Sequence, residues 1–207
     1  MPQRCSSILY SNTMYPAMDI TASFTYNFFT SGIPSTTNYG FGVFFTTGST
    51  TTLQGGGAGV GLGMVSSSIA TPLSCINGIY FAIGFDNLGN FCRQGAAPYF
   101  ATGLGAQNIH SITVRKDYSD LNFLSCIVPP LCGIFTLDTE HTIRINIRKM
   151  FTVVDIFVLS GAQYQKIASF DTLIDPKTLP PLLKFGISYA GDTQFYIKNP
   201  TINFSPS

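Results

Sequence analysis

Charged side chains are scarce in this chain: Asp, Glu, Lys and Arg together make up 10% of its 207 residues, against about a quarter in typical soluble proteins. The net charge of +1 leaves no basic surface for nucleic acid or anionic lipid, so we expect no nucleic-acid partner. Residues 20–85 contain no Asp, Glu, Lys, Arg or His. This stretch indicates either a solvated Ser/Thr surface or a neutral surface for sugars or other protein subunits.

Side chains that perform catalysis are also few. Glu140 is the only glutamate, which excludes a glycosidase that uses two glutamates. Two acidic pairs, Asp117 with Asp120 and Asp138 with Glu140, lie beside turn-like segments, where Asp is ordinarily a solvated turn residue. The chain has no nucleophile elbow, no phosphate-binding loop and no dinucleotide fingerprint. We therefore predict that the protein is not an enzyme.

Long apolar runs and export signals are missing too. The most apolar window, residues 121–135, is too short to span a bilayer and is interrupted by two prolines. No apolar segment follows the basic residue near Met1, so we expect no signal peptide and no membrane insertion. The location stays open, with a virion among the alternatives.

The five cysteines are an odd number, so at least one thiol is unpaired within the chain. Cys75 and Cys92 flank one apolar strand, and Cys126 and Cys132 flank the double proline, so either pair is a candidate disulfide. Without an export signal, reduced and buried thiols are favoured at all five positions, the fifth being Cys5. The cysteines lack zinc-site spacing, and the two histidines lie far apart in the sequence.

Strand signals, by contrast, occur along the whole chain. Residues 20–28 and 144–148 alternate apolar and polar side chains, as a sheet with one wet face requires. Residues 39–45 and 79–86 interleave apolar and small residues, which predicts central strands crossed closely by other backbone. Further strands are predicted at 111–116, 141–147, 152–159, 163–170, 182–189 and 194–204. Turn residues separate these runs.

Helix signals are poor, and residues 171–179 hold at most one short turn. The Thr- and Gly-rich segment 46–63 is flanked by strands, so we interpret it as an internal loop. About a dozen strands without helices predict an all-β jelly-roll sandwich of two antiparallel sheets, forming a single domain over residues 1–207.

Several segments, in order, resemble the L-type (legume-like) lectins of the concanavalin-A-like superfamily. Residues 39–45 (YGFGVFF) are similar to the apolar strand that follows the sugar-binding loop, and residues 55–63 (GGGAGVGLG) to the Gly-rich loop after it. Residues 80–90 (YFAIGFDNLGN) resemble the strand and loop with the metal ligands. Residues 183–192 and 195–204 resemble the last two strands. The resemblance implies a concanavalin-A-like sandwich.

The family's metal site is only partly present. The resemblance places a metal-binding acid at Asp86, a backbone carbonyl ligand at Leu88 and a side-chain ligand at Asn90. The first acid of the family is Gly84 here and the later loop acid is Gly95, while His110 lies late for the family's histidine ligand. Calcium prefers six to eight oxygen ligands, several of them anionic. We therefore expect no cofactor, with a degenerate calcium site as the alternative and a turn cap as the structural interpretation of Asp86 and Asn90.

The sugar site implied by the resemblance is altered as well. The family places a carboxylate just before the Gly that opens the apolar strand, and that position is Tyr39 here, preceded by Asn38. A phenol cannot replace the bidentate acceptor. Tyr39 could instead stack on a sugar face, while Asn38 or the backbone N–H groups of Gly55, Gly56 and Gly57 bond hydroxyls. The alternative is that Tyr39 packs at the strand edge.

Two functions therefore stay open. The first is a lectin-like module for recognition or host attachment that binds neutral glycans weakly and gains strength from multivalency. The second is a structural virion or appendage protein that uses the lectin fold as a building block. Both predict glycan or protein partners, with a homo-oligomer or larger assembly expected.

Overall fold

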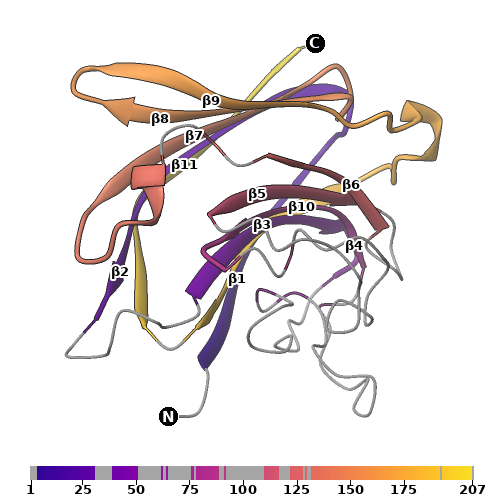
Figure 1. Cartoon of the computed structure of the whole chain (residues 1–207). Coiled ribbons are helices and arrows are strands. Elements are labelled where there is room, and N and C mark those ends of the chain that lie inside the picture. Colours follow the sequence, from indigo (N-terminus) through magenta and orange to yellow (C-terminus); the bar gives the residue numbers. More distant parts are fainter. Residues whose placement is uncertain are drawn as a thin grey trace.

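The computed structural model describes residues 4–30, 39–50, 62, 64, 76, 78–88, 91, 110–116, 122–127, 129, 132–191 and 193–206. These residues form eleven β-strands and two short 3-10 turns, with no α-helix among them (Figure 1). The strands are β1 (Arg4–Met14), β2 (Met18–Phe29), β3 (Tyr39–Thr47), β4 (Ile79–Asp86), β5 (Ser111–Lys116), β6 (Asn122–Ile127), β7 (His141–Arg148), β8 (Val153–Ser160), β9 (Gln163–Asp171), β10 (Leu183–Gly191) and β11 (Gln194–Pro206). The 3-10 turns are η3 (Cys132–Phe135) and η4 (Pro176–Thr178).

The strands make two antiparallel sheets packed face to face. One sheet has six strands in the order β1-β10-β3-β4-β5-β6, and the other has five in the order β11-β2-β7-β8-β9. The final strands β10 and β11 lie in different sheets, each paired with strands from the start of the chain. This arrangement confirms the predicted all-β sandwich of two antiparallel sheets.

The main core lies between the two sheets and is dominated by aromatic rings. Strand β2 turns Phe24, Tyr26 and Phe28 inward; Thr25 is partly exposed between the first two rings, whereas Asn27 is buried at 3% exposure. Phe41 of β3 stacks on Phe85 of β4, with ring centroids 4.4 Å apart and 13° between the planes. Rings of this size bury large apolar areas, so their packing is the main stabilising contribution to the sandwich.

A second apolar layer covers the outer face of the six-stranded sheet. Small residues on that face leave room for it: a Cβ built on Gly42 would meet Met64 at 2.3 Å, and one on Gly84 would meet Phe91 at 2.2 Å. The buried cluster on this face contains Phe44, Leu62, Met64, Ile76, Ile79, Ala82 and Phe91. We call this cluster the covering layer.

The covering layer changes the interpretation of the charge-free stretch. Strands β3 and β4 are buried on both faces, because one face lines the main core and the other meets the covering layer. The absence of charge from residues 39–47 and 79–85 therefore reflects two-sided burial, as in parallel sheets with both faces covered. Neither sequence-based alternative, a solvated Ser/Thr surface or a neutral contact surface, describes these two strands.

The outer face of the five-stranded sheet is polar, as the alternation in β7 predicts. Asp155 lies on this face, 2% exposed, and accepts hydrogen bonds from Ser169, Lys166 and Arg148. Burial by itself raises the pKa of this carboxyl, but the three donors outweigh it and lower the pKa below its usual value. Asp155 is therefore a charged structural group of the sheet.

Two strands and one thiol differ from the sequence predictions. Strands β1 and β6 were not predicted. Cys126 is disulfide-bonded, whereas reduced thiols were favoured. That preference depended on the expectation of no export signal and not on the distance between cysteines. The side chains of the other cysteines lie outside the described residues.

Within the described ranges, no helix is long and apolar enough to cross a membrane.

Candidate functional site

The end of β4 and the start of β3 are tied together by one residue, Asn87. Its side-chain Oδ1 accepts from the backbone N of Tyr39 at 2.8 Å, and its own backbone N donates to the carbonyl oxygen of Tyr39 at 3.2 Å. Its carbonyl oxygen accepts from the backbone N of His110 at 3.0 Å. Asn87 is 7% exposed. Three segments therefore meet here, and we call Tyr39, Asp86–Leu88 and His110 the loop corner.

Asp86 closes the turn that follows β4. Its Oδ1 accepts from the backbone N of Leu88 at 3.0 Å, and its Oδ2 accepts from the backbone N of Phe91 at 2.7 Å. The carboxylate is 1% exposed. Side-chain oxygens of Asp commonly bond to the backbone two residues on in this way. Both oxygens thus bind the loop's own backbone, which matches the turn-cap interpretation.

These residues do not fit a calcium site. Asp86 is the one acid that the turn contributes within the described ranges, and each of its oxygens already binds a backbone N–H. A carboxylate cannot be accommodated at Gly84, because the Phe91 ring occupies the space of a Cβ. In the described ranges no group of three or more His, Cys, Asp or Glu could hold a metal ion. Such a donor set falls short of the several anionic oxygens that calcium prefers.

Tyr39 does not present its ring for stacking on a sugar. It is 4% exposed, its ring packs against Phe28 at 4.7 Å between centroids, and its hydroxyl donates to the carbonyl oxygen of Phe135 at 2.6 Å. Burial raises the pKa of this phenol, while the hydrogen bond with Asn87 acts in the opposite direction. The stacking role does not fit this geometry, whereas the alternative of packing at the strand edge does.

Of the other predicted site residues, one lies in the described part of the chain and five lie outside it. Leu88 lies in the turn after β4, and its backbone N–H is used by Asp86. Asn38, Gly55, Gly56, Gly57 and Asn90 lie outside the described residues, so their predicted roles remain predictions. The sequence analysis overlooked Asn87, although an Asn directly after a strand-ending Asp is a recognisable turn signal.

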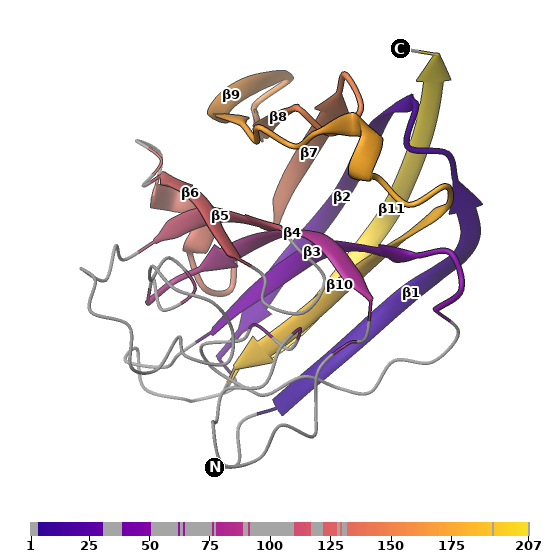
Figure 2. The ribbon, with the colours of Figure 1, turned by 90° about the vertical axis from the view of Figure 1, so that its right-hand side faces the viewer.

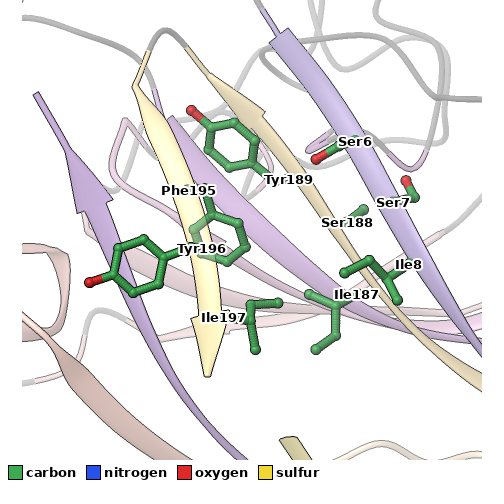
Figure 3. Close-up of a pocket in the computed structure, with 9 residues that line it drawn as sticks. All are labelled: Ser6, Ser7, Ile8, Ile187, Ser188, Tyr189, Phe195, Tyr196 and Ile197. Atoms are coloured by element: carbon green, nitrogen blue, oxygen red, sulfur yellow. The ribbon is translucent and has the colours of Figure 1, made fainter. Parts of the chain in front are cut away.

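Strands β1 and β11 lie near each other at one edge of the sandwich (Figure 2), and a separate hollow is lined there by residues of both strands. It has a volume of about 260 Å³ and includes residues of β1, β10 and β11. Figure 3 shows the rings of Tyr189 and Phe195 side by side within it, whereas the ring of Tyr196 points away. The first two rings stack with centroids 4.9 Å apart. Ile8, at 57% exposure, stands at the outer side of this hollow.

The hollow continues along the same two strands. A second cavity of about 150 Å³ is formed by Tyr10, Asn12 and Met14 of β1 with Ile202 and Phe204 of β11. Each of these strands is the outermost strand of its sheet. Ile8 is 57% exposed and Tyr10 is partly exposed, so the side of β1 that lines the cavities is only partly covered. We call the two cavities together the edge groove.

The comparisons with known proteins point to one fold. The lectin from Bauhinia forficata in complex with GalNAc has a TM-score of 0.66 and 16% identity, with 100% of this chain and 82% of that chain covered. Lectin I-B4 from Griffonia simplicifolia in its metal-free form has a TM-score of 0.62 and 15% identity, covering 97% and 80%. The carbohydrate recognition domain of Emp46p has a TM-score of 0.52 and 12% identity, covering 96% and 77%.

No protein-family model matches the chain, and no curated protein matches its sequence. The likeness is therefore one of three-dimensional structure at low identity, extending over nearly the whole chain. It agrees with the two-sheet topology and confirms the fold expected from the segment resemblance. This chain has the concanavalin-A-like sandwich fold of the legume L-type lectins.

Proposed function

We propose that this protein is a non-enzymatic recognition module that binds neutral glycans weakly at the loops attached to the loop corner. One observation carries the proposal. Asn87 bonds both backbone groups of Tyr39, which fixes the points where segments 31–38 and 89–109 join the sheet. Loops positioned by a rigid scaffold are the usual place for binding residues. The lectin fold and the low overall charge support a neutral ligand.

The mode of binding differs from the one that the resemblance implies. Since Tyr39 is buried, the sugar contacts come from amide and backbone groups, for which Asn38 and Gly55 to Gly57 are the candidates. Such neutral donors and acceptors replace a carboxylate, and neutral hydrogen bonds are roughly half as strong as charge-assisted ones. Affinity per site is therefore low, and useful binding comes from several copies acting together.

The Asn87→Ala variant tests the proposal on a glycan array. We expect the wild-type chain, displayed in several copies, to bind a defined set of neutral glycans on the array. It should not cleave the glycans that it binds. Asn87→Ala removes the side-chain bond to the backbone N of Tyr39 and leaves the backbone bond to its carbonyl oxygen, so retention should fall by about tenfold or more, in line with the loss of about 1–3 kcal/mol from an unpaired buried group.

Asn203→Ala is the matched control, because Asn203 is exposed on β11 in the other sheet. It should bind as the wild type does. The melting temperatures of all three proteins show whether each is folded at the assay temperature. Wild-type chain that retains no glycan, or folded Asn87→Ala that binds unchanged, would refute the proposal.

A structural role in an assembly is the second candidate, and the edge groove favours it. The groove exposes apolar side chains, Ile8 at 57% and Phe204 at 38%. Exposed apolar patches of this kind mark contact surfaces in soluble proteins. The chain's net charge is close to zero, so copies do not repel one another strongly. A second copy of the chain is therefore the occupant that we expect.

Mass measurement in solution separates the two candidates. If copies associate through the groove, the wild-type chain is a dimer or larger, and Ile8→Lys shifts it to monomer because a buried ammonium is costly. Leu173→Lys is the control, since Leu173 is 78% exposed and lies elsewhere, after β9. A wild-type monomer at all concentrations, or an oligomer that Ile8→Lys leaves intact, would rule out assembly through this groove.

A further inference from the structure

Arg115 is the largest fully buried side chain in the described part of the chain, at 0% exposure. It lies on β5, directly opposite Ala82 of β4, on the face that the covering layer packs against. Burial lowers the pKa of this guanidinium to about 9, so it still carries its charge at neutral pH. A buried cation destabilises a fold unless its partners compensate. The interactions of the buried guanidinium must therefore offset the free-energy cost of its burial.

Two hydrogen bonds and a ring contact link Arg115 to Phe91. Nε and Nη2 of Arg115 donate to the carbonyl oxygen of Phe91 at 3.0 and 2.8 Å, and the guanidinium carbon lies 5.0 Å from the centre of the Phe91 ring. The backbone N of the same residue donates to Oδ2 of Asp86 at 2.7 Å. One residue of the loop is thus held by a carboxylate at its N–H and by a guanidinium at its carbonyl group.

The ring of Phe91 occupies the space next to β4 that an acidic side chain would need. A Cβ on Gly84 would lie 2.2 Å from Cδ1 of Phe91. Gly84 is the position that matches the first acid of the lectin metal loop. A packed ring therefore lies where the resemblance implies an acid, and a buried guanidinium contacts that ring.

We propose that Arg115 and Phe91 take over the role of the metal ions, so that the loop after β4 is locked without calcium or a transition metal. Asp86, Phe91 and Arg115 form what we call the clamp. In the clamp a guanidinium supplies the positive charge, a ring supplies the packing, and the carboxylate closes the turn through backbone N–H groups. Because the cation is part of the chain, it cannot be removed by a chelator.

Thermal unfolding with and without metal tests the clamp directly. The wild-type protein is dialysed against EDTA and then measured with EDTA, with calcium chloride or with manganese chloride in millimolar excess. We expect melting temperatures that agree within about 1 °C, whereas one saturated ion site would raise the melting temperature by about 5–10 °C in a chain of this size. A saturable rise of that size with either ion would overturn the proposal.

The Arg115→Met variant tests the guanidinium itself. It keeps an unbranched apolar side chain but removes the guanidinium, which leaves the carbonyl group of Phe91 without its two donors, so we expect the melting temperature to fall by about 10 °C. Arg144→Met is the matched control, because Arg144 lies partly exposed over Tyr164 on the other sheet. It should lose less than about 3 °C. Equal losses in the two variants would contradict the clamp.

Hydrogen exchange keeps the proposal testable if Arg115→Met fails to fold. In the wild-type protein the amide of Phe91 is bonded to a buried carboxylate, so the peptide that contains it should exchange slowly and at the same rate in EDTA and in calcium. Exchange that becomes at least about tenfold faster in EDTA would show that an ion holds the loop, and the clamp would be refuted.

Discussion

Phe41→Ala is expected to lower the free energy of unfolding by about 4 kcal/mol, because it leaves a large cavity at the centre of the main core. Phe41 is fully buried and its ring contacts rings of both sheets. It stacks on Phe85 at 4.4 Å and on Phe195 at 5.5 Å, and it lies 4.7 Å from Tyr26. The neighbours come from three other strands, so the site cannot collapse to fill the space.

Urea unfolding of the purified variant measures this loss. Phe157→Ala is the control, because Phe157 is only half-buried, on the outer face of the five-stranded sheet. It should cost about 1 kcal/mol or less. If Phe41→Ala and Phe157→Ala lose similar stability, the packing of the two sheets around Phe41 is wrong.

Gly84→Val is expected to cost about 3 kcal/mol for the opposite reason, since it adds atoms where the covering layer has no room. A Cβ at this position would meet Phe91 at 2.2 Å and Leu62 at 2.7 Å. The ring of Phe91 cannot move freely, because its backbone is held by Asp86 and Arg115. The added side chain must therefore displace the loop or bend the strand.

Gly133→Val provides the comparison for this substitution. A Cβ on Gly133 has no neighbour within 4 Å, and the residue is exposed in η3. We expect a change within about 0.5 kcal/mol, as for most surface substitutions. Urea unfolding of both variants gives the numbers. A Gly84→Val protein as stable as the wild type would show that the covering layer is not packed against β4.

The strands that the sequence predicts best are those with a clear period. Nine predicted segments match observed strands to within a few residues, from β2 at 18–29 to β11 at 194–206. Strand β1 was overlooked because its Ser- and Asn-rich sequence, RCSSILYSNTM, carries no sustained alternation. It lies at the edge of its sheet, where one side of the backbone needs no partner and the pattern is accordingly weak.

The site was predicted less completely than the fold. Asp86 was identified as a candidate, and the turn-cap alternative describes its contacts. The role of Arg115 could not be predicted, because it depends on the pairing of β5 with β4 and on a loop residue 24 positions away. Such contacts depend on register, which a local sequence pattern does not specify.

The small residues of β3 and β4 show how one pattern permits two interpretations. The small residues of these strands were taken as places where other backbone crosses closely, whereas a Cβ on Gly42 or Gly84 would meet the side chains of Met64 and Phe91. The absence of charge from residues 20–85 indicated either a solvated Ser/Thr surface or a neutral contact surface. Only the covering layer shows that β3 and β4 are buried on both faces, so the glycines serve packing first.

The most direct test of glycan recognition without a metal is binding of the full chain to a glycan array in two buffers, one with EDTA and one with calcium. We expect the same glycans to bind at the same strength in both buffers, because the loop corner and the clamp use only the chain's own groups. Binding that disappears in EDTA, or no binding in either buffer, would contradict it.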